Sequence, residues 1–575
     1  MKASLTRSRS VVFGLFVIAS HWLSAYCSEP GEVGLAYHVD VFGRDDNPGT
    51  SPEKAWRTIE RANRHDFTPG DRLLFAGGQT FAGNLIIGAN DAGTPERPVV
   101  IGTYGQGRAT IKAGLGTAVL VKDASGVDVR DIRCEGAGMS KNHGCGVAFV
   151  NTLPGNVRKK HVRIRNVDAR GFGRDTKSPL ERSGDFRPPA GCGVFVGGDP
   201  SDKSKSGFDD IEIDGCDLYE NEFYGALFTG CWDEKATSYA NHGLVVAGCR
   251  FHGNAGDPDY RQKHSGSGLL VEDTDGGLVD RCVAWENGAL CNQTPGGPCG
   301  IWTAGSRRIT IQRCESLRNR TGNAPDGDGF DLDGGSIECV LQYNYSHDND
   351  GAGILVYTYP YAPWADRGNI VRYNICEGDA VKLGDYGAIH VGNDGHGMSG
   401  IEIYHNTFIA GASARTVVSL HGKEVGVSFR NNLIVAPTGC PLVTNDHDAD
   451  AIIFQGNLYW SGGRAFKTAG AKTCDSLDAW RTTGKEMMNG KAVGLFADPL
   501  LKLSAPPVQA INLTRPGRFA RYQPSAGSPA VDAAIDLKAR FNFDRGGLDF
   551  LGTKTATSNP PDIGAVEMLN GIAEK

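Results

Sequence analysis

Apolar residues recur along this chain in short alternating segments, and helical spacing is rare. Typical pairs are Val127/Val129, Ile211/Ile213 and Ile309/Ile311. A period of two predicts a strand with one buried face. Three positions after each such pair, a further inward position recurs, mostly at intervals of about 25 to 35 residues, which is the period of a solenoid. It is occupied by Ile132, Val167, Cys216, Cys249, Cys282, Cys314, Asn344, Asn374, Asn406, Asn432 and Asn457.

This repeat predicts an all-β, single-stranded, right-handed parallel β-helix of about eleven coils, because no amphipathic run between strands could supply a crossover helix. Like residues of successive coils would then stack about 4.8 Å apart. Cys216, Cys249, Cys282 and Cys314 are therefore expected to form one interior ladder that the asparagines continue. Five residues later an asparagine often recurs and is expected to hydrogen-bond turn backbone: Asn221, Asn254, Asn287, Asn319 and Asn349. Cys291 and Cys299 are candidates for a local disulfide.

The two ends of the chain differ from the repeat. Residues 1–27 have the basic start and short apolar run of a secretory signal peptide, so we expect a secreted or periplasmic protein. Residues 33–115 are expected to form an N-terminal cap and the first coils, with a helix starting near Ser51 that presents Trp56, Ile59 and Ala62 on one face. Residues 116–465 would form the β-helix, and 466–575 a C-terminal capping segment with a short helix.

Composition narrows the class of partner. The chain has 575 residues, 79 of them glycine, 40% hydrophobic residues and a net charge of −7. This hydrophobic content excludes a disordered chain, and the acidic balance argues against nucleic acid as a partner. No segment after the signal peptide is long and apolar enough to span a membrane, and we expect a monomer.

Both ends of the mature chain carry segments that resemble a known group. YHVDVFGRDDNPGTSPEKAWRTIERAN followed by FTPGDRLLFAGGQTF, and later GSPAVDAA with PPDIGAVE, are similar to the opening and ending of secreted right-handed parallel β-helix proteins of the pectate-lyase-like superfamily. The resemblance covers nearly the whole mature chain and implies the fold. It implies no single chemistry, because the superfamily includes polysaccharide lyases, glycoside hydrolases, epimerases and non-enzymatic proteins.

One coil, GDGFDLDGG, concentrates acidic residues on its outer face. Phe330 and Leu332 are expected to fill the core, which directs Asp331 and Asp333 outward. Paired carboxylates suit glycoside hydrolysis, and repulsion between them would raise one pKa and so supply the acid. Asp331 and Asp333 are our candidate catalytic pair. Glu272, two coils away in the Asp333 column, and His390, two coils away in the Asp331 column, are further catalytic candidates.

A metal site is the second interpretation of the same segment. Asp326 and Asp328 precede the pair, and calcium prefers several carboxylate oxygens. A calcium-dependent pectate lyase would carry a lysine base where this chain has Asp333, so elimination would need Lys382 or His390 to move the proton. The third interpretation is a turn rich in Asp and Gly. No cofactor is required by the first interpretation, and calcium is required by the second.

Aromatic side chains near this coil favour a carbohydrate ligand, since rings present apolar faces to the C–H faces of sugars. Candidate substrate-binding residues are Trp302, Tyr357, Tyr359, Tyr361, Trp364 and Lys382. The sequence therefore predicts a carbohydrate-active enzyme that cleaves a polysaccharide or oligosaccharide, with hydrolysis favoured over metal-dependent elimination on an acidic polysaccharide. A non-catalytic carbohydrate-binding or accessory β-helix is the third hypothesis.

Overall fold

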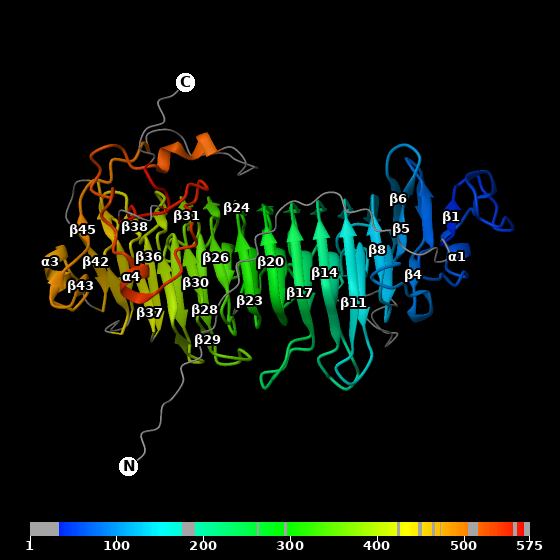
Figure 1. Cartoon of the computed structure of the whole chain (residues 1–575), viewed down its shortest axis with the longest axis horizontal. Coiled ribbons are helices and arrows are strands. Elements are labelled where there is room, and N and C mark those ends of the chain that lie inside the picture. Colours follow the sequence, from blue (N-terminus) through cyan, green and yellow to red (C-terminus); the bar gives the residue numbers. More distant parts are fainter. Residues whose placement is uncertain are drawn as a thin grey trace, which may run out of the picture.

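The computed structural model describes residues 34–174, 190–261, 264–292, 296–422, 426–446, 451–462, 466–471, 473–503, 516–555 and 560–568. Strands coil around one long axis and form three parallel sheets, of which sheets A and B have 14 strands each and sheet C has 13. This arrangement confirms the right-handed parallel β-helix (Figure 1). Each coil contributes a strand first to sheet A, then to sheet B and then to sheet C. The expected signal peptide, 1–27, lies outside the described residues and stays a prediction.

The three sheets have the following strands. Sheet A contains β1 (Ala36–Val39), β2 (Arg72–Ala76), β5 (Val99–Tyr104), β8 (Val127–Arg130), β11 (Arg158–Arg165), β14 (Gly207–Asp214), β17 (Asn241–Ala247), β20 (Thr274–Asp280), β23 (Arg307–Gln312), β26 (Val340–Gln342), β30 (Ile370–Arg372), β34 (Ile401–Tyr404), β37 (Val427–Arg430) and β40 (Ile453–Gln455). Sheet B contains β3 (Thr80–Ala82), β6 (Ala109–Gly114), β9 (Ile132–Gly136), β12 (Asp168–Arg170), β15 (Asp217–Tyr219), β18 (Arg250–His252), β21 (Val283–Trp285), β24 (Glu315–Leu317), β27 (Tyr345–His347), β31 (Ile375–Glu377), β35 (Thr407–Ile409), β38 (Leu433–Val435), β41 (Leu458–Trp460) and β45 (Leu495–Phe496). Sheet C contains β4 (Leu85–Ile87), β7 (Val119–Lys122), β10 (Val147–Asn151), β13 (Cys192–Gly198), β16 (Tyr224–Thr229), β19 (Ser267–Glu272), β22 (Cys299–Ala304), β25 (Asp328–Leu332), β28 (Ile354–Thr358), β32 (Ile389–Asn393), β36 (Val418–Gly422), β39 (Val443–Asn445) and β42 (Thr468–Gly470).

Few other regular elements are described. Two further small sheets pair β29 (Asp366–Arg367) with β33 (Met398–Ser399) and β43 (Met487–Met488) with β44 (Lys491–Ala492). The helices are η1 (Pro52–Lys54), α1 (Ile59–Ala62), η2 (Ala89–Asp91), α3 (Leu477–Arg481), η3 (Pro516–Tyr522) and α4 (Leu537–Phe541). None of the helices in the described ranges has the length and apolarity needed to cross a bilayer.

The N-terminal end is capped by shorter helices than the sequence suggested. The expected helix from Ser51 is divided into η1 and α1, because Ala55 between them is extended. Trp56, Ile59 and Ala62 are nevertheless fully buried, as predicted for one apolar face. This end of the solenoid therefore keeps its hydrophobic cover without a continuous helix.

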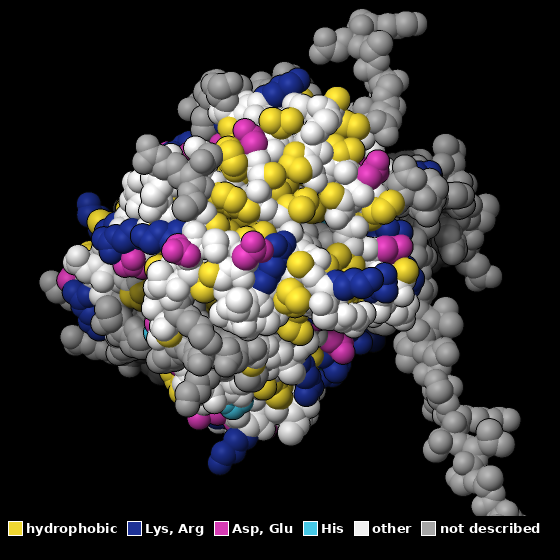
Figure 2. Space-filling view, turned by 90° about the vertical axis from the view of Figure 1, so that its left-hand side faces the viewer, with side chains coloured by type: hydrophobic (Ala, Val, Ile, Leu, Met, Phe, Trp, Pro, Cys, Tyr) yellow, Lys and Arg dark blue, Asp and Glu magenta, His cyan; other side chains and the backbone are white. Residues whose placement is uncertain are grey.

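The C-terminal segment has two roles. Helix α3 covers the open end of the solenoid, where Trp480 contacts the rings of Phe454, Tyr459 and Phe466. Figure 2 views this end, where hydrophobic side chains gather in the upper part of the face and charged side chains lie mostly below them. Residues 516–555 and 560–566 return over the outer face of sheet B and bury a second apolar cluster there. The expectation of a simple end cap is thus incomplete.

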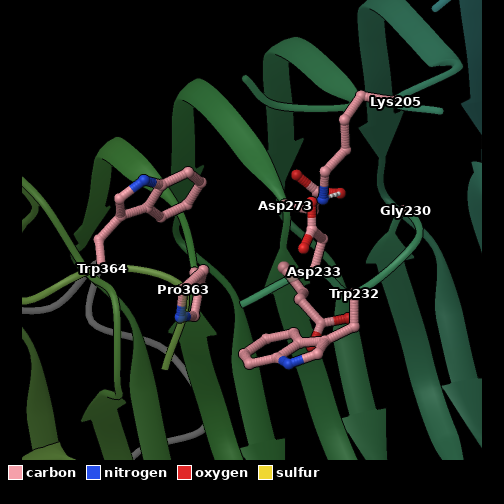
Figure 3. Close-up of a pocket in the computed structure, with 9 residues that line it drawn as sticks. Lys205, Gly230, Trp232, Asp233, Asp273, Pro363 and Trp364 are labelled. Atoms are coloured by element: carbon pink, nitrogen blue, oxygen red, sulfur yellow. Dashed lines mark hydrogen bonds and ion pairs between the residues drawn. The ribbon is translucent and has the colours of Figure 1, made fainter. Parts of the chain in front are cut away.

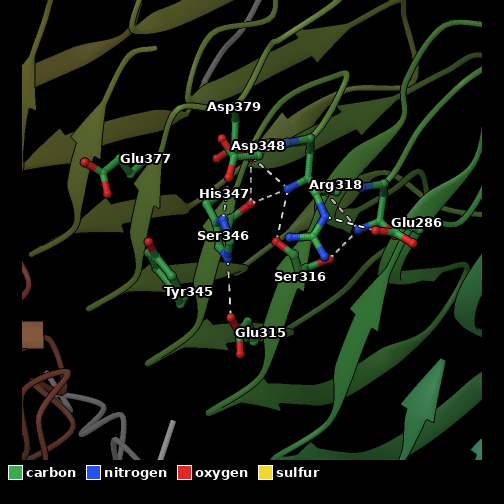
Figure 4. A network of polar contacts seen from close by, with 12 residues as sticks. Glu286, Glu315, Ser316, Arg318, Tyr345, Ser346, His347, Asp348, Glu377 and Asp379 are labelled. Carbon is green, nitrogen blue, oxygen red and sulfur yellow. Dashed lines mark hydrogen bonds and ion pairs between the residues drawn. The ribbon is translucent and has the colours of Figure 1, made fainter. Parts of the chain in front are cut away.

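Polar contacts hold this returning segment on sheet B. Arg521 and Tyr522 both donate to the Glu377 carboxylate of β31. In the neighbouring network, His347 lies between Glu315 and Asp348 (Figure 4). Burial alone would lower the pKa of His347, but hydrogen bonds to Asp348 and Glu315 raise it to about 9. The outer face of sheet B is therefore occupied by the protein's own C-terminal segment over these coils.

The predicted interior ladder is present. The backbone N–H of Cys216 contacts the sulfur of Cys249 at 3.5 Å, and the N–H of Cys314 donates to Asn344 Oδ1 at 2.9 Å. From there each asparagine accepts from the preceding one, as Asn374 Oδ1 does from both the backbone and side-chain nitrogens of Asn344 at 3.0 Å. All cysteines in the described ranges are free thiols. The disulfide hypothesis for Cys291 and Cys299 is therefore wrong, because Cys299 Sγ instead faces aspartate oxygens on sheet C.

The asparagines that were expected to hydrogen-bond turn backbone form a second ladder, donate to strand carbonyls such as those of Ala169 and Leu218, and end on an aspartate. Asn221, Asn254, Asn287, Asn319 and Asn349 stack in order, each accepting from the one before. Asn349 then donates to Asp379 Oδ1 at 2.7 Å. Asp379 is 1% exposed, and burial raises its pKa to about 7. Its Oδ2 has no hydrogen-bond partner in the structure.

Replacing Asp379 with Asn should stabilise the protein at pH 8 by about 1–3 kcal/mol, because it removes a buried charge from a position that asparagine fits in five preceding coils. A carboxyl whose folded pKa is raised contributes stability below its unfolded pKa near 4 and loses it as the pH rises through 7. The gain from Asp379→Asn should therefore shrink at pH 5. Denaturant midpoints at both pH values test this, and an equal shift at pH 5 and pH 8 would contradict it.

Candidate functional site

The outer face of sheet C carries the side chains that the sequence singled out. Strand register places Leu270, Trp302, Asp331, Leu355 and His390 in one column. In the neighbouring column Glu272 pairs with Ala304 and Tyr357 with Gly392, and Asp333 directly follows Leu332, the last residue of β25 that has a register partner on each side. Phe330 and Leu332 are fully buried in the core, as expected. Sequence reasoning therefore placed Asp331, Asp333, Glu272 and His390 on the correct face and in the correct columns.

Two aspartates form the buried floor of this face. Asp328 is fully buried and Asp331 is 2% exposed. Asp328 accepts from the backbone of Ala352, and Cys299 Sγ lies 3.9 Å from Asp328 Oδ2 and 3.8 Å from Asp331 Oδ2. Burial first, then the neighbouring carboxyls, raise the pKa of both aspartates well above the ordinary value. Both carboxyls therefore favour the protonated form more than an exposed aspartate does.

Two other aspartates flank this floor and are partly exposed. Asp326 precedes β25 and accepts from Gly297 N–H at 2.6 Å and from the Tyr386 hydroxyl at 3.2 Å. Burial raises its pKa to about 6, against these hydrogen bonds. Asp333 follows β25, and burial raises its pKa to about 7. Hydrogen bonds from Gly334 N–H and the Tyr359 hydroxyl act in the opposite direction and lower this pKa. The charge on Asp326 raises the pKa of Asp333 further, so the two carboxyls are electrostatically linked.

The tyrosine loop after β28 lies beside these carboxyls. The rings of Tyr359 and Tyr361 are 4.3 Å apart, and Tyr361 is 48% exposed. Burial and the charges of Asp333 and Asp326 both raise the pKa of Tyr361. Tyr357 donates to Asp394 at 2.6 Å. Three of the aromatic residues predicted from sequence are thus gathered at the acidic site.

Glu272 stands two coils from Asp333 in the same column, with Ala304 between them. Its carboxylate is partly exposed and accepts from the Thr229 hydroxyl. Its charge contributes to the raised pKa of Asp333. Ala304, the residue between Glu272 and Asp333 on this face, has only a methyl side chain and leaves space between the two carboxyls.

The remaining sequence candidates lie at some distance from the exposed carboxyls or are engaged elsewhere. Trp302 is 3% exposed and packs against the His264 ring at 4.7 Å, so its face is not open to a sugar. His390 is 8% exposed, shares a hydrogen bond with Ser419 at 3.0 Å, and has its pKa lowered to about 3 by burial. Lys382 Nζ donates to the carbonyls of Thr321 and Gly322. Trp364 lines a separate pocket near Glu272.

The metal interpretation stays a prediction. Within the described ranges, no three or more His, Cys, Asp or Glu side chains are grouped so as to hold an ion. Asp326 and Asp328 each have protein donors, so their oxygens are partly satisfied by the chain itself.

Sequence reasoning missed Tyr386, which donates to Asp326 and stacks on His390 at 4.6 Å. It also missed the buried pair of Lys205 and Asp273, whose Nζ and Oδ2 atoms are 2.7 Å apart. Tyr386 lies in an irregular loop, outside the strand alternation that located the columns. Asp273 directly follows Glu272, but its left-handed φ of 52° turns it out of the strand pattern.

Comparison with known proteins agrees with the fold. A family described as "Right handed beta helix region" matches residues 185–375. The lacto-N-biosidase of Bifidobacterium longum subsp. longum is 21% identical over 621 aligned residues, which cover 93% of this chain and 36% of that protein. The chain therefore spans about a third of the length of this relative.

Solved structures give the same result. The native GH136 lacto-N-biosidase from Eubacterium ramulus superposes with a TM-score of 0.50 and 21% identity over 68% of this chain and 67% of that chain. The pectate lyase Pel9A is 14% identical and covers 93% of this chain and 97% of its own, with a TM-score of 0.38. The family match over residues 185–375 and the superposition with a TM-score of 0.50 confirm the resemblance to β-helix proteins that the terminal segments indicated.

Proposed function

We propose that the protein is a glycoside hydrolase that cleaves an oligosaccharide or polysaccharide on the outer face of sheet C. One observation carries this proposal: the partly exposed carboxyls of Asp326 and Asp333 lie just before and just after β25, the charge of Asp326 raises the pKa of Asp333, and the exposed Tyr361 lies against the partly buried Tyr359 beside them. Glycoside hydrolysis needs one protonated and one ionised carboxyl. Linked carboxyls with raised pKa values can supply both forms near neutral pH.

Asp333 is the residue on which the proposal depends most. Its pKa of about 7 keeps it largely protonated in mildly acidic solution, which suits the general acid. Asp326, with a pKa of about 6, is ionised first and suits the base or nucleophile. Asp331 was the sequence-based partner, but a side chain that is 2% exposed has little surface to offer a sugar. Glu272 is the alternative second carboxyl.

The similarity to lacto-N-biosidases supports a carbohydrate-active enzyme and favours hydrolysis over elimination. Elimination is also less well supported by the site. Lys382 is engaged with backbone carbonyls, and His390 is buried beside Ser419. We further propose that the protein is exported, that it acts without a metal ion, and that it is a monomer.

An activity screen tests this function. Purified protein is incubated with neutral and acidic polysaccharides and with oligosaccharides that end in lacto-N-biose, with and without a chelator. We expect new reducing ends, no ultraviolet absorbance from a new double bond, and no effect of the chelator. Absorbance that rises with cleavage would favour a lyase instead, and binding without cleavage would favour an accessory protein.

A further inference from the structure

A pocket opens where β16, β19 and β22 end, on the side of the sheet C face where Asp333 lies. Its main lining residues are Lys205, Trp232, Glu272, Asp273, Pro363 and Trp364, and it is open to solvent on one side. Figure 3 shows Trp364 on one side of the opening and the Lys205–Asp273 pair on the other, with Pro363 and Trp232 below them. The pocket thus has an aromatic side and a polar side.

The polar side is rigid because it is buried. Lys205 Nζ donates to Asp273 Oδ2 at 2.7 Å and to the carbonyl of Cys231 at 2.6 Å. The side chains of Lys205 and Asp273 are 9% and 6% exposed. An ammonium group has three N–H donors, so the third is available to a ligand hydroxyl.

The aromatic side of the pocket is fixed by packing of its residues against Tyr239 and Gly305. The Trp364 ring contacts Tyr239 with centroids 4.6 Å apart, and Tyr239 is itself buried. Trp232 and Pro363 both approach Gly305, where an added Cβ would lie 3.5 Å and 3.1 Å from them. Gly305 has a φ of +50°, so any larger residue would be both strained and crowded there. Both tryptophans are partly exposed toward the pocket.

The charge of the pocket selects among sugars. Among the residues that line the pocket, Lys205 is the one cation, and the carboxyls are those of Asp273, Glu272 and Asp233. This excess of acidic groups opposes a uronate or sulfated sugar. Indole faces and a fixed N–H donor suit a neutral pyranose, which has C–H faces and hydroxyls.

The pocket also has a defined position relative to the proposed cleavage site. Glu272 belongs both to the pocket lining and to the column of Asp333. Two coils separate Glu272 from Asp333, a distance of roughly 9.6 Å along the axis. A saccharide chain that runs along the solenoid could therefore occupy both places at once.

We infer that this pocket is a subsite that binds a neutral pyranose unit of the saccharide cleaved at Asp333. The inference rests on the proposed function. It adds Trp232, Lys205 and Asp273 to the binding surface and excludes acidic polysaccharides as the preferred substrates.

Binding to an inactive variant tests the subsite separately from catalysis. In an Asp333→Asn background, calorimetric titrations use lacto-N-tetraose, chitotetraose and tetragalacturonate as probes. We expect one of the two neutral probes to bind and the uronate to bind more weakly. Adding Trp364→Ala or Trp232→Ala should weaken binding of the neutral probe by roughly tenfold or more.

Trp285 supplies the matched control, because it is a partly exposed tryptophan on sheet B, where it stacks on His252 at 4.0 Å. Trp285→Ala should leave affinity unchanged. Equal affinity of Trp364→Ala and its parent, stronger binding of the uronate, or no binding of either neutral probe would overturn the subsite. If the wild-type protein binds the neutral probe through Trp364 without cleaving it, the subsite stands and the proposed hydrolysis fails.

Discussion

Replacement of Asp333 with asparagine should lower kcat/KM on the cleaved saccharide by roughly 10²- to 10⁴-fold, because it removes the proton that the leaving oxygen must receive. Asparagine has nearly the same shape and can still accept from Gly334 N–H, so the fold should persist. Reducing-end assays measure the rate, and circular dichroism melting shows whether the variant is folded. Full activity in a folded Asp333→Asn variant would exclude this residue as the acid.

The pH dependence of the wild-type protein follows from the same pair. Asp326 must be ionised, so kcat/KM should rise with pH through about 6. Asp333 must be protonated, so kcat/KM should fall as pH passes about 7. The two groups are linked and titrate together, and the expected profile is therefore a narrow bell with its maximum between these values. Asp333→Asn should remove the alkaline limb from whatever activity remains.

Companion variants identify the second carboxyl. Asp326→Asn should cause a loss similar to that of Asp333→Asn. Asp331→Asn should cause a much smaller loss, because Asp331 is buried and its pKa is raised well above the ordinary value, so that an amide replaces a group that already favours its neutral form. Asp385→Asn is the matched control, since Asp385 is exposed and pairs only with the exposed Arg415. Loss of activity in Asp331→Asn equal to that in Asp333→Asn would restore the sequence-based pair.

The stereochemistry of the product tests whether Glu272 is the carboxyl that acts together with Asp333. Carboxyls about two coils apart leave room for a water molecule and predict inversion at the anomeric carbon. Retention requires closer carboxyls and would exclude Glu272 as the partner of Asp333. Nuclear magnetic resonance of the first-formed anomer distinguishes the two outcomes.

The sequence predicted the parts of this site that follow from strand alternation. Asp331 and Asp333 were placed outward because Phe330 and Leu332 had to be inward, and all four positions agree with the structure. The columns that join Glu272 to Asp333 and Asp331 to His390 followed from the repeat length alone. Period and register are local properties, so one sequence contains enough information to derive them.

Burial and loop placement could not be derived in this way. Asp331 is outward yet 2% exposed, because Trp302 and Leu355 fill the neighbouring positions of its column. The loops that carry Tyr386 and Trp364 have no period, and their contacts depend on packing between coils distant in sequence. For the same reason the sequence did not predict that residues 516–555 and 560–566 return over sheet B, where interactions such as the hydrogen bond from Tyr522 to Glu377 stabilise them.

Replacement of Asn374 with leucine should destabilise the solenoid by about 3–5 kcal/mol, the largest effect expected of any interior variant discussed. Asn374 Oδ1 accepts from both nitrogens of Asn344, and its own amide donates to the Leu341 carbonyl at 2.8 Å and to Asn406 at 3.0 Å. All of these groups are buried. Leucine would leave two donors of Asn344 and one carbonyl without partners, with no water to replace them. Chemical denaturation measures the change in stability, and hydrogen exchange locates it in the coils from β26 to β34.

Cys249→Val supplies the contrast at the same ladder position, four coils nearer the N-terminus. Valine there would remove only weak sulfur contacts: the N–H of Cys216 to the Cys249 sulfur at 3.5 Å, and the Cys249 thiol to the carbonyls of Ala247 at 3.3 Å and Ile213 at 3.7 Å. Valine already occupies this ladder position at Val167, where it is fully buried. We therefore expect Cys249→Val to cost about 1 kcal/mol or less. Equal costs for the two variants would mean that packing volume, and not the asparagine hydrogen bonds, holds the C-terminal coils in register. A difference of several kcal/mol would show that the change from cysteine to asparagine after Cys314 marks a change from apolar to hydrogen-bonded stacking inside one continuous solenoid.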